Sequence, residues 1–391
     1  MKKEIAILKI LEEPKIGGPQ IYALLLSYAL RGEVNTTILM PRKDSQDFRA
    51  LCQSYNIKYK TFPLSRITKE LREAARYIMF SFYEIYKLYN FFKSNKAEII
   101  YIAGGSWQFK GLIAGRLANK HIIWHLNDTY IPRFLRFVFS KLSGLADMYI
   151  YASERTKDYY EPLIKNPKIG YVIPAPVDTN HFDPNIELEN TRDSSLIASW
   201  EGKIIVGMVA NINPVKGVQD FIKTAANLNK RHNSLYFIII GPVFKNQSSY
   251  FKTLELLCKK EGLLNISFLG SRSDVRPLLK RIDVYLCTSV AESSPISVWE
   301  AMSMAKAIVS TNVGDVSRFI EDGLNGCITD SGDIEQITSS VDNLIKNNYL
   351  RREFGIKSRE VAINRLDVKN CAANHLLAYN RLLGIPAQDK I

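Results

Sequence analysis

The chain has 391 residues, of which 46% are hydrophobic and 23% are charged. This composition describes a globular protein larger than one hydrophobic core usually supports, so two domains are expected. The formal net charge is +13, and residues 1–180 hold most of it, with 27 Lys and Arg against 16 Asp and Glu. A basic half indicates an acidic partner such as phosphate, an anionic membrane or nucleic acid, although a solvated basic surface explains it equally well.

Cysteines and apolar runs exclude several further classes. The five cysteines are scattered without a CxxC pair, which argues against a zinc or redox site and fits a reducing compartment. The apolar run at residues 4–10 is interrupted by Lys9 and ends in charges, so it predicts a strand rather than a signal peptide. No apolar run in the sequence approaches the ~20 residues that cross a bilayer. We expect a cytoplasmic protein whose membrane contact is at most peripheral.

Short β-rich runs alternate with helical patterns along the first half. A strand at 4–10 precedes Gly17-Gly18 and an apolar helix at 20–30. Further strands are expected at residues 36–40, 98–104, 121–126 and 148–153. These strands are nearly continuous apolar runs, which is typical of parallel sheets covered by helices on both faces.

Two helical stretches of this half, at residues 69–96 and 131–144, combine aromatic and basic side chains. Such amphipathic segments suit a membrane interface, where rings lie at the headgroup level and Lys or Arg faces anionic lipid. They also suit helices that pack on the sheet with their basic residues in water. For 69–96 the wide apolar face favours packing on the sheet, whereas for 131–144 both interpretations stay open.

The second half repeats the alternation. Strands are expected at residues 203–209, 235–241, 266–270, 283–289 and 307–311, and helices from 333 to near 383. Two series of this kind predict two doubly wound α/β domains. The boundary is expected within residues 172–185, where Pro174, Pro176 and Pro184 exclude the interior of a strand or helix.

The stretch 292–300, ESSPISVWE, places two carboxylates eight residues apart. It follows a predicted strand, at the edge where open α/β sheets bind ligands. Ser294 is expected to cap a helix whose first residue is Pro295 and whose free amides form an anion site. Glu292 lies on the loop before this helix and Glu300 inside it. An anion flanked by two polyhydroxyl groups, as in sugar, phosphate and sugar, would satisfy this pattern.

Other strand ends carry further candidates. In the loop NINPVKG, Lys216 is placed to neutralise a phosphate and Gly217 to let the backbone approach it. Gly17 and Gly18 form a similar strand-to-helix turn in the first half. His125 stands at the end of a strand, although a lone histidine is more often a core residue. Each of these features alone is weak evidence for a site, but all of the residues lie at the ends of predicted strands.

These segments resemble the retaining glycosyltransferases of family 4, which have the GT-B fold. The resemblance rests on ESSPISVWEAMSMAKAIVSTNVGD, similar to that family's E-x7-E signature and following strand, and on NINPVKG, VIPAPVDTNHFDP, KIGGPQ and HIIWHLND. It implies two Rossmann-like domains facing a central cleft, with an acceptor-side domain over 1–176 and a nucleotide-sugar-binding domain over 177–365. Residues 366–391 are expected to form a helix that packs back towards the first domain.

The resemblance implies roles on the donor side of the site. Glu300 would accept hydrogen bonds from the ribose hydroxyls of a nucleotide-sugar. Lys216 would neutralise the leaving diphosphate, helped by the amides of Ser297 and Val298. Glu292 would hold a hydroxyl of the transferred sugar.

The same likeness implies roles for five more residues. Ser293 and Ser294 would lie beside the transferred sugar. His125 would sit near that sugar from the other domain, as a catalytic residue together with the lysine and the first glutamate. Gly17 and Gly18 would let their loop approach the diphosphate and the acceptor.

Several positions depart from the family pattern. Asn211 stands where an arginine is common, five residues before the lysine, so one diphosphate contact is missing or is supplied elsewhere, for example by Arg272. The glycine pair that follows the next strand is Gly314-Asp315 here, and Arg318 replaces a common glutamate. These changes leave the donor and the loop geometry open.

The expected function is transfer of one sugar, with retention, from a nucleotide-sugar to a glycan acceptor. The acceptor is expected to be lipid-linked and to belong to a bacterial surface polysaccharide: lipopolysaccharide, capsule or exopolysaccharide. The nucleotide-sugar is a co-substrate, and neither a cofactor nor a metal ion is expected, because a lysine and a helix dipole can replace Mg²⁺. Two alternatives stay open, a nucleotide-sugar epimerase of the same fold and a non-catalytic basic membrane-binding protein. No recognised nucleic-acid motif is present.

Overall fold

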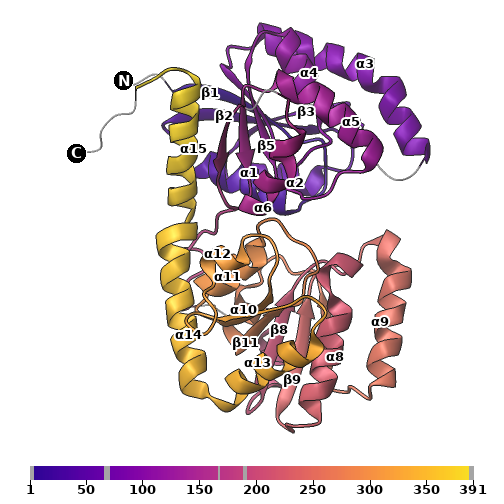
Figure 1. Ribbon diagram of the computed structural model, residues 1–391, viewed down its shortest axis with the longest axis vertical. Coiled ribbons are helices and arrows are strands. Elements are labelled where there is room, and N and C mark those ends of the chain that lie inside the picture. Colours follow the sequence, from indigo (N-terminus) through magenta and orange to yellow (C-terminus); the bar gives the residue numbers. More distant parts are fainter. Residues whose placement is uncertain (1–3, 66–70, 166–167, 188–191, 387–391) are drawn as a thin grey trace. The chain divides into compact units, whose positions relative to one another are not determined.

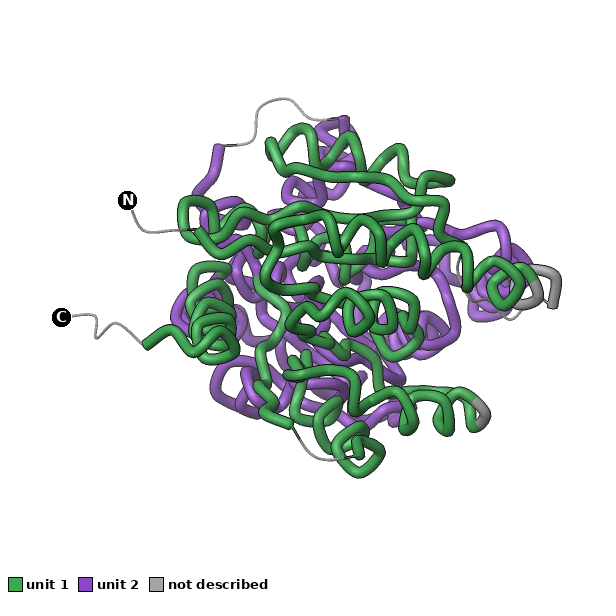
Figure 2. Tube along the Cα trace, turned by 90° about the horizontal axis from the view of Figure 1, so that it is seen from above, with its two compact units in different colours: residues 1–176, 368–391 green, residues 177–367 purple. Residues whose placement is uncertain are grey.

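The computed structural model describes residues 4–65, 71–165, 168–187 and 192–386. The chain folds into two compact units, which Figure 2 shows in green and purple. Residues 1–176 together with 368–391 form unit 1, and residues 177–367 form unit 2. Within the described ranges, no helix is both long enough and apolar enough to cross a membrane.

Unit 1 is built on a seven-stranded sheet of order β3-β2-β1-β4-β5-β6-β7. All neighbouring strands are parallel. The strands are β1 (Ile5–Ile10), β2 (Val34–Pro41), β3 (Lys58–Phe62), β4 (Ile99–Ile102), β5 (His121–Leu126), β6 (Met148–Tyr151) and β7 (Ile169–Val172). The helices, many of them labelled in Figure 1, are α1 (Gly18–Ala29), α2 (Gln46–Ser54), α3 (Leu71–Ser94), α4 (Phe109–Leu117), α5 (Arg133–Leu142), α6 (Glu154–Tyr160) and α15 (Val368–Leu382).

Unit 2 repeats this design with a six-stranded parallel sheet of order β10-β9-β8-β11-β12-β13. The strands are β8 (Ile204–Val209), β9 (Leu235–Ile240), β10 (Ile266–Gly270), β11 (Val284–Cys287), β12 (Ala307–Thr311) and β13 (Cys327–Thr329). The helices are α7 (Ser194–Ala198), α8 (Val218–Asn229), α9 (Ser248–Lys260), α10 (Arg276–Arg281), α11 (Ile296–Ser303), α12 (Val316–Phe319), α13 (Ile334–Lys346) and α14 (Asn348–Val361).

The expectation of two Rossmann-like α/β domains is confirmed by these two sheets. In each sheet the strand order reverses direction once, between β1 and β4 in unit 1 and between β8 and β11 in unit 2. The carboxyl ends of strands at such a switch point diverge from their helices and leave a crevice where ligands bind. The two switch points are therefore the first places to look for a site.

Three strands escaped the sequence-based prediction, and all three lie at sheet edges: β3, β7 and β13. The β3 sequence KYKTF is largely exposed, β7 contains a glycine, and β13 has only three residues. An edge strand lacks the continuous apolar run of a strand covered on both faces. The central strands were predicted because they are almost completely buried.

Helix α3 packs on the sheet of unit 1 through one face and exposes an apolar opposite face. Tyr77, Leu88 and Phe92 are buried, whereas Ile78 is 70% exposed and Phe82 is 83% exposed. The interpretation that favoured packing on the sheet expected basic residues towards water. The outer face instead carries large apolar side chains between basic ones.

The face of the unit 1 sheet under α1 and α15 holds a buried polar network. Because side chains alternate along a strand, Lys9, Tyr101 and His125 point to this face, while their neighbours join the apolar core beneath α3, α4 and α5. Lys9 Nζ donates to Ser27 Oγ of α1 at 3.0 Å. Burial lowers the pKa of Lys9 to about 7.

His375 joins α15 to this network. Its Nδ1 lies 3.0 Å from the carbonyl oxygen of Cys371, which only accepts, so Nδ1 carries the proton. Burial holds the pKa of His375 well below its usual value, so the ring is neutral and Nε2 is an acceptor. The Tyr101 hydroxyl donates to it at 3.1 Å. The Tyr22 hydroxyl lies 3.3 Å from it and also lies 3.5 Å from the carbonyl oxygen of Ile173, to which it can donate.

Replacement of this acceptor is expected to destabilise unit 1. In His375→Ala, the buried hydroxyl of Tyr101 loses its acceptor, whereas that of Tyr22 keeps the Ile173 carbonyl. The change should lower the free energy of unfolding by on the order of 1–3 kcal/mol. Leu377→Ala is the matched control, because Leu377 lies on the same helix and is mostly exposed; its change should stay within about 0.5 kcal/mol. Urea unfolding followed by circular dichroism measures both, and equal effects would contradict the role of the network.

Candidate active site

The first half of the site is the connection between β8 and α8 in unit 2. After β8, a single turn of 3-10 helix spans Pro214–Lys216. The Asn213 side chain caps this turn by accepting a hydrogen bond from the Val215 amide at 3.0 Å. The turn ends at Gly217, which has φ +62 and is the N-cap residue of α8. This local geometry places Lys216 at the carboxyl end of β8.

Two hydrogen bonds fasten this connection to the loop that follows β11. Thr288 Oγ1 donates to the Gly217 carbonyl at 2.9 Å, and the Val290 amide donates to the Val215 carbonyl at 2.8 Å. A Cβ on Gly217 would overlap the Thr288 carbonyl oxygen. Glycine is therefore required for two reasons, its left-handed backbone and this close approach. Because β8 and β11 flank the switch point, both loops meet there.

The fastened loops bring Lys216 and Glu292 into an ion pair. Ser289 Oγ also donates to Glu292 Oε1 at 2.8 Å. Both members of the pair remain partly open to solvent. The structure thus joins the two residues that the sequence placed on separate strand ends, and the pair presents a cation and a carboxylate side by side.

Helix α11 begins one residue later than predicted, at Ile296. The Ser294 side chain does not cap it. Instead Ser294 Oγ accepts a hydrogen bond from Trp299 Nε1 at 3.1 Å, which fixes the loop against the buried indole. The prediction of a Ser294 cap with Pro295 as first helical residue is wrong, because the indole competes for the serine hydroxyl.

The first turn of α11 offers fewer free amides than expected. The Val298 amide donates to the Pro295 carbonyl at 2.9 Å, so it is not available to a ligand as predicted. The amides of Ile296 and Ser297 have no acceptor among the described residues, as the first turn of a helix normally leaves them. An anion site here would consist of these two amides and the helix dipole.

The loop after β12 contacts the loop that joins β11 to α11. Gly314 has φ +54, and a Cβ there would overlap the Ser293 carbonyl oxygen, which also accepts from the Asp315 amide at 3.1 Å. Asp315 itself has φ −95, which any residue adopts, and it pairs with Arg318 at 3.5 Å. This explains why only the first position of the family's glycine pair needs glycine here.

Glu300 lies on α11 three residues after Ser297, on the same helix face. Burial raises the pKa of its carboxyl to about 8. The carboxylate accepts no hydrogen bond from any described residue, although its side chain is partly accessible. Ser297 lies within hydrogen-bonding reach of the Tyr285 hydroxyl. A partly buried carboxylate without a partner among the described residues favours a ligand that brings hydroxyl donors to it.

One predicted donor-side residue, Arg272, does not join this cluster, and a second, Asn211, lies in the lysine loop. The Arg272 guanidinium pairs with Asp193 through Nε at 2.9 and 3.0 Å, and it also donates to the carbonyls of Leu269 and Ser271. This arginine follows β10, at the edge of the sheet, so its predicted role as a substitute diphosphate contact is not supported. Asn211 follows β8 in the same loop as the lysine, without a side-chain partner among the described residues.

His125 is a core residue of unit 1. Its side chain is only 2% exposed, between Tyr22 and Tyr101, and its ring centroid lies 4.7 Å from that of Tyr22. Burial, together with the charge of Lys9, lowers the pKa of His125 to about 3. The prediction that it reaches the sugar as a catalytic group is wrong, because the strand turns this side chain towards α1 and α15.

The first-half glycines stand at the start of α1. Gly17 is the N-cap residue, in extended conformation, and Gly18 is the first helical residue. A Cβ on Gly17 would make only ordinary contacts. Both glycines belong to unit 1, whereas the lysine, the two glutamates and the serines belong to unit 2. The structure therefore leaves their shared contact with a diphosphate as a prediction.

Sequence reasoning missed Thr288, Ser289 and Tyr285, which position the site. All three follow or belong to β11, directly before the signature stretch. The polar run after an apolar strand was the available signal for Thr288 and Ser289. Among the described residues, no group of three or more His, Cys, Asp and Glu could hold a metal ion.

Comparison with known proteins points to glycosyltransferases. The family model for glycosyl transferases group 1 matches residues 191–361, within unit 2. A Campylobacter jejuni N,N'-diacetylbacillosaminyl-diphospho-undecaprenol alpha-1,3-N-acetylgalactosaminyltransferase is 24% identical over 269 residues, or 66% of this chain and 68% of that one. An Escherichia coli UDP-Gal:alpha-D-GlcNAc-diphosphoundecaprenol alpha-1,3-galactosyltransferase is 22% identical over 267 residues, or 65% and 68% of the two chains.

Solved structures share the fold over nearly the whole chain. The Anabaena protein HepE, crystallised with UDP and glucose, has a TM-score of 0.82 at 18% identity, covering 97% of this chain and 100% of that one. A Rickettsia africae glycosyltransferase also has a TM-score of 0.82, at 16% identity, with 97% and 99% coverage. The predicted GT-B fold and the general likeness to glycosyltransferases are confirmed. Membership of family 4 and the E-x7-E signature stay predictions.

The Gly217 contact can be tested by substitution. Gly217→Ala combines left-handed strain with overlap on the Thr288 carbonyl, and it should destabilise unit 2 by on the order of 3 kcal/mol. Gly262→Ala is the matched control, since Gly262 has φ +65 but nothing within 4 Å of its added Cβ. Its cost should be about 1 kcal/mol. Thermal unfolding compares the two, and similar melting temperatures would show that the close approach contributes nothing.

Proposed function

We propose that the protein is a retaining glycosyltransferase of family 4 that moves a sugar from a nucleotide-sugar to a glycan acceptor. The observation that carries this proposal is the Lys216–Glu292 pair at the switch point of unit 2, followed on α11 by the unpartnered carboxylate of Glu300. A cation, two free amides and two carboxylates match a diphosphate with a sugar on each side.

The proposed chemistry follows from charge. As the bond between the anomeric carbon and the diphosphate oxygen breaks, negative charge grows on the diphosphate and positive charge on the sugar. Lys216 and the amides of Ile296 and Ser297 stabilise the departing diphosphate. The acceptor hydroxyl attacks from the same face, and the leaving phosphate takes its proton. This chemistry requires neither a metal ion nor a cofactor.

Roles for individual residues follow the same proposal. Glu300 accepts hydrogen bonds from the ribose hydroxyls, and Glu292 holds a hydroxyl of the transferred sugar while it orients Lys216. Ser293 and Ser294 shape the sugar pocket through a loop that Gly314 and Trp299 hold in place. The two glutamates are thus binding groups on opposite sides of the diphosphate rather than an acid and a nucleophile.

We further propose a lipid-linked acceptor in bacterial surface polysaccharide synthesis. The support is the likeness to two transferases whose names specify diphospho-undecaprenol substrates. The basic first half, +11 over residues 1–180, suits a diphosphate and an anionic membrane. The enzyme would then work in the cytoplasm, peripherally on the inner face of the membrane.

Nucleoside diphosphates provide the direct test. At a concentration of about 100 Kd, the true nucleotide should stabilise the protein by about 2.7 kcal/mol through mass action. Lys216→Ala should weaken that nucleotide by about tenfold or more, because it removes a charge-assisted contact. Lys223→Ala is the matched control, an exposed lysine of α8 in the same unit. A thermal-shift screen with UDP, GDP, ADP, CDP and TDP measures the effect.

Outcomes of this screen separate the alternatives. Equal stabilisation of both lysine variants would remove Lys216 from the donor site. A sugar that is epimerised when donor is supplied without acceptor would favour the epimerase. Failure of every nucleotide to bind the wild-type protein would favour a non-catalytic membrane-binding protein.

The membrane contact has its own test. Ile78 and Phe82 are exposed on the outer face of α3, and the same helix carries the exposed basic residues Arg76, Lys87 and Lys93. Ile78→Ser with Phe82→Ser should weaken binding to phosphatidylglycerol vesicles, measured by flotation, by about a hundredfold or more, since each buried side chain contributes about 1.5–3 kcal/mol. Leu264→Ser is the matched control, because Leu264 is 95% exposed in unit 2. Vesicle binding that changes neither with salt concentration nor with these substitutions would contradict a membrane contact through α3.

A further inference from the structure

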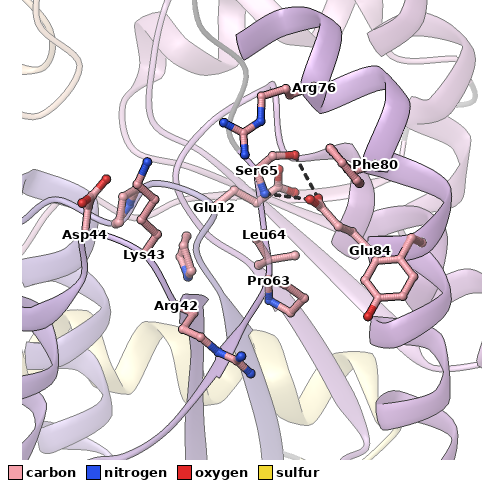
Figure 3. Close-up of a pocket in the computed structure, with 13 residues that line it drawn as sticks. Glu12, Arg42, Lys43, Asp44, Pro63, Leu64, Ser65, Arg76, Phe80 and Glu84 are labelled. Carbon is pink, nitrogen blue, oxygen red and sulfur yellow. Dashed lines mark hydrogen bonds between the residues drawn. The ribbon is translucent and has the colours of Figure 1, made fainter. Parts of the chain in front are cut away.

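Unit 1 contains a pocket of about 590 Å³ at the carboxyl ends of β1, β2 and β3. Glu12 enters it from the segment after β1, Arg42 from the segment after β2 and Ser65 from the segment after β3. Phe80 of α3 closes one side (Figure 3). The pocket lies wholly within unit 1 and shares no residue with the donor-side cluster of unit 2.

One acid of the pocket is fully satisfied by its surroundings. Glu84 of α3 accepts hydrogen bonds from the Ser65 amide at 2.9 Å and the Ser65 hydroxyl at 3.1 Å, and it forms an ion pair with Lys110. Both members of this pair are almost completely buried. A buried pair with all its hydrogen bonds made fixes geometry. Glu84 and Lys110 therefore hold the segment after β3 against α3 and α4.

The second acid is not satisfied. Glu12 is only 4% exposed, yet its Oε1 has no hydrogen-bond partner among the described residues. Its carboxyl otherwise lies within hydrogen-bonding reach of the Tyr77 hydroxyl and of the backbone amides of Lys110 and Gly111. Burial raises the pKa of Glu12 to about 7. A buried oxygen without a donor costs stability. Because Glu12 is one of the residues that line the pocket, a ligand that supplies a donor there would remove this cost.

The mouth of the pocket is cationic. Arg42, Lys43 and Arg76 line it, against the single exposed carboxylate of Asp44. Arg42 and Lys43 form no ion pair with any described residue. Figure 3 shows Glu12 near the centre of the lining residues, with Arg76 and Arg42 on opposite sides of it in that view. An anion at the mouth would find two uncommitted cations.

One wall of the pocket is apolar and continues onto the outer face of α3. Phe80 and Tyr83 line the pocket, and both are about half exposed. Ile78 and Phe82 lie on the same helix beyond them and are mostly exposed. A ligand with a hydroxyl, an anion and an apolar tail would meet, in that order, Glu12, the cations and the α3 face.

We propose that this pocket binds a glycosyl diphosphate, the headgroup of the acceptor, with a sugar hydroxyl donating to Glu12 and the phosphates held by Arg42 and Lys43. This inference rests on the proposed function and assigns the acceptor's headgroup to residues of unit 1. The lipid chain then leaves along the aromatic face of α3. A bare phosphate would leave Glu12 Oε1 without a donor, and a neutral sugar would leave the cations unused.

The two ends of the ligand can be tested separately in the full chain. Isothermal titration with citronellyl N-acetylglucosaminyl diphosphate, its methyl counterpart and inorganic pyrophosphate distinguishes the chain, the sugar and the phosphates. Glu12→Gln keeps the shape of the side chain. It should weaken both glycosyl diphosphates by about tenfold and leave pyrophosphate unchanged, because only the sugar hydroxyl uses this group.

Arg42→Ala with Lys43→Ala should weaken all three ligands by at least about tenfold. Arg31→Ala with Lys58→Ala is the matched control, since these exposed basic residues of unit 1 lie outside the pocket and remove the same charge. Stronger binding of the citronellyl compound than of the methyl compound would support the path along α3. Equal binding would restrict the site to the headgroup and overturn that path.

UDP and GDP titrations in the same preparations keep this inference apart from the proposed function. The pocket variants should bind the nucleotide as the wild-type protein does. A wild-type protein that binds a nucleotide but no glycosyl diphosphate overturns the pocket assignment alone. Equal losses in the pocket and control double variants would also overturn it, since the effect would be long-range charge. A protein that binds neither nucleotide nor glycosyl diphosphate contradicts both proposals.

Discussion

The candidate active site depends on one backbone contact, the approach of Gly217 to the carbonyl of Thr288. This contact joins the loops after β8 and β11 at the switch point of the unit 2 sheet, with a hydrogen bond from Thr288 to fix the distance. Lys216 and Glu292 are neighbours only because these loops are joined. Any side chain at position 217 would separate them, so a residue that touches no ligand determines how cation and carboxylate are presented.

The buried and partly buried carboxylates of the two candidate sites differ in whether the protein itself supplies their hydrogen-bond donors. Glu84 and Glu292 each have a lysine and a serine as partners, and they hold loops together. Oε1 of Glu12 has no partner among the described residues, and Glu300 is shifted by burial alone, without a hydrogen bond from a described residue. Because burial raises the pKa of both to about 7 or 8, each gains from a hydroxyl donor. Sugars and riboses carry such donors, which is why the two unsatisfied acids are the best candidates for direct ligand contacts.

The face of the unit 1 sheet beneath α1 and α15 shows how buried lysine and histidine side chains can serve stability. Lys9, His125 and His375 are buried beneath α1 and α15, and burial lowers the pKa of each. A hydrogen bond from Tyr101 of β4 to His375 joins the last helix to a sheet formed more than 200 residues earlier in the chain. The two histidines are neutral in this environment. His125 contributes ring packing, and Lys9 and His375 contribute hydrogen bonds.

The sequence by itself determined the class of fold and the position of the donor-side motif. Central strands such as β5 and β12 are apolar throughout because helices cover both of their faces, and the spacing of Glu292 and Glu300 is a property of one loop and one helix. Edge strands such as β3 escaped notice because half-exposed strands lack that signal. Only the tertiary structure decided that the His125 side chain is buried beneath α1 and α15. It also decided that Arg272 pairs with Asp193, and that the Trp299 indole donates its hydrogen bond to the Ser294 hydroxyl. The physical reason is that these outcomes depend on partners from distant strands and helices, whose competition for one side chain leaves no local trace in the sequence.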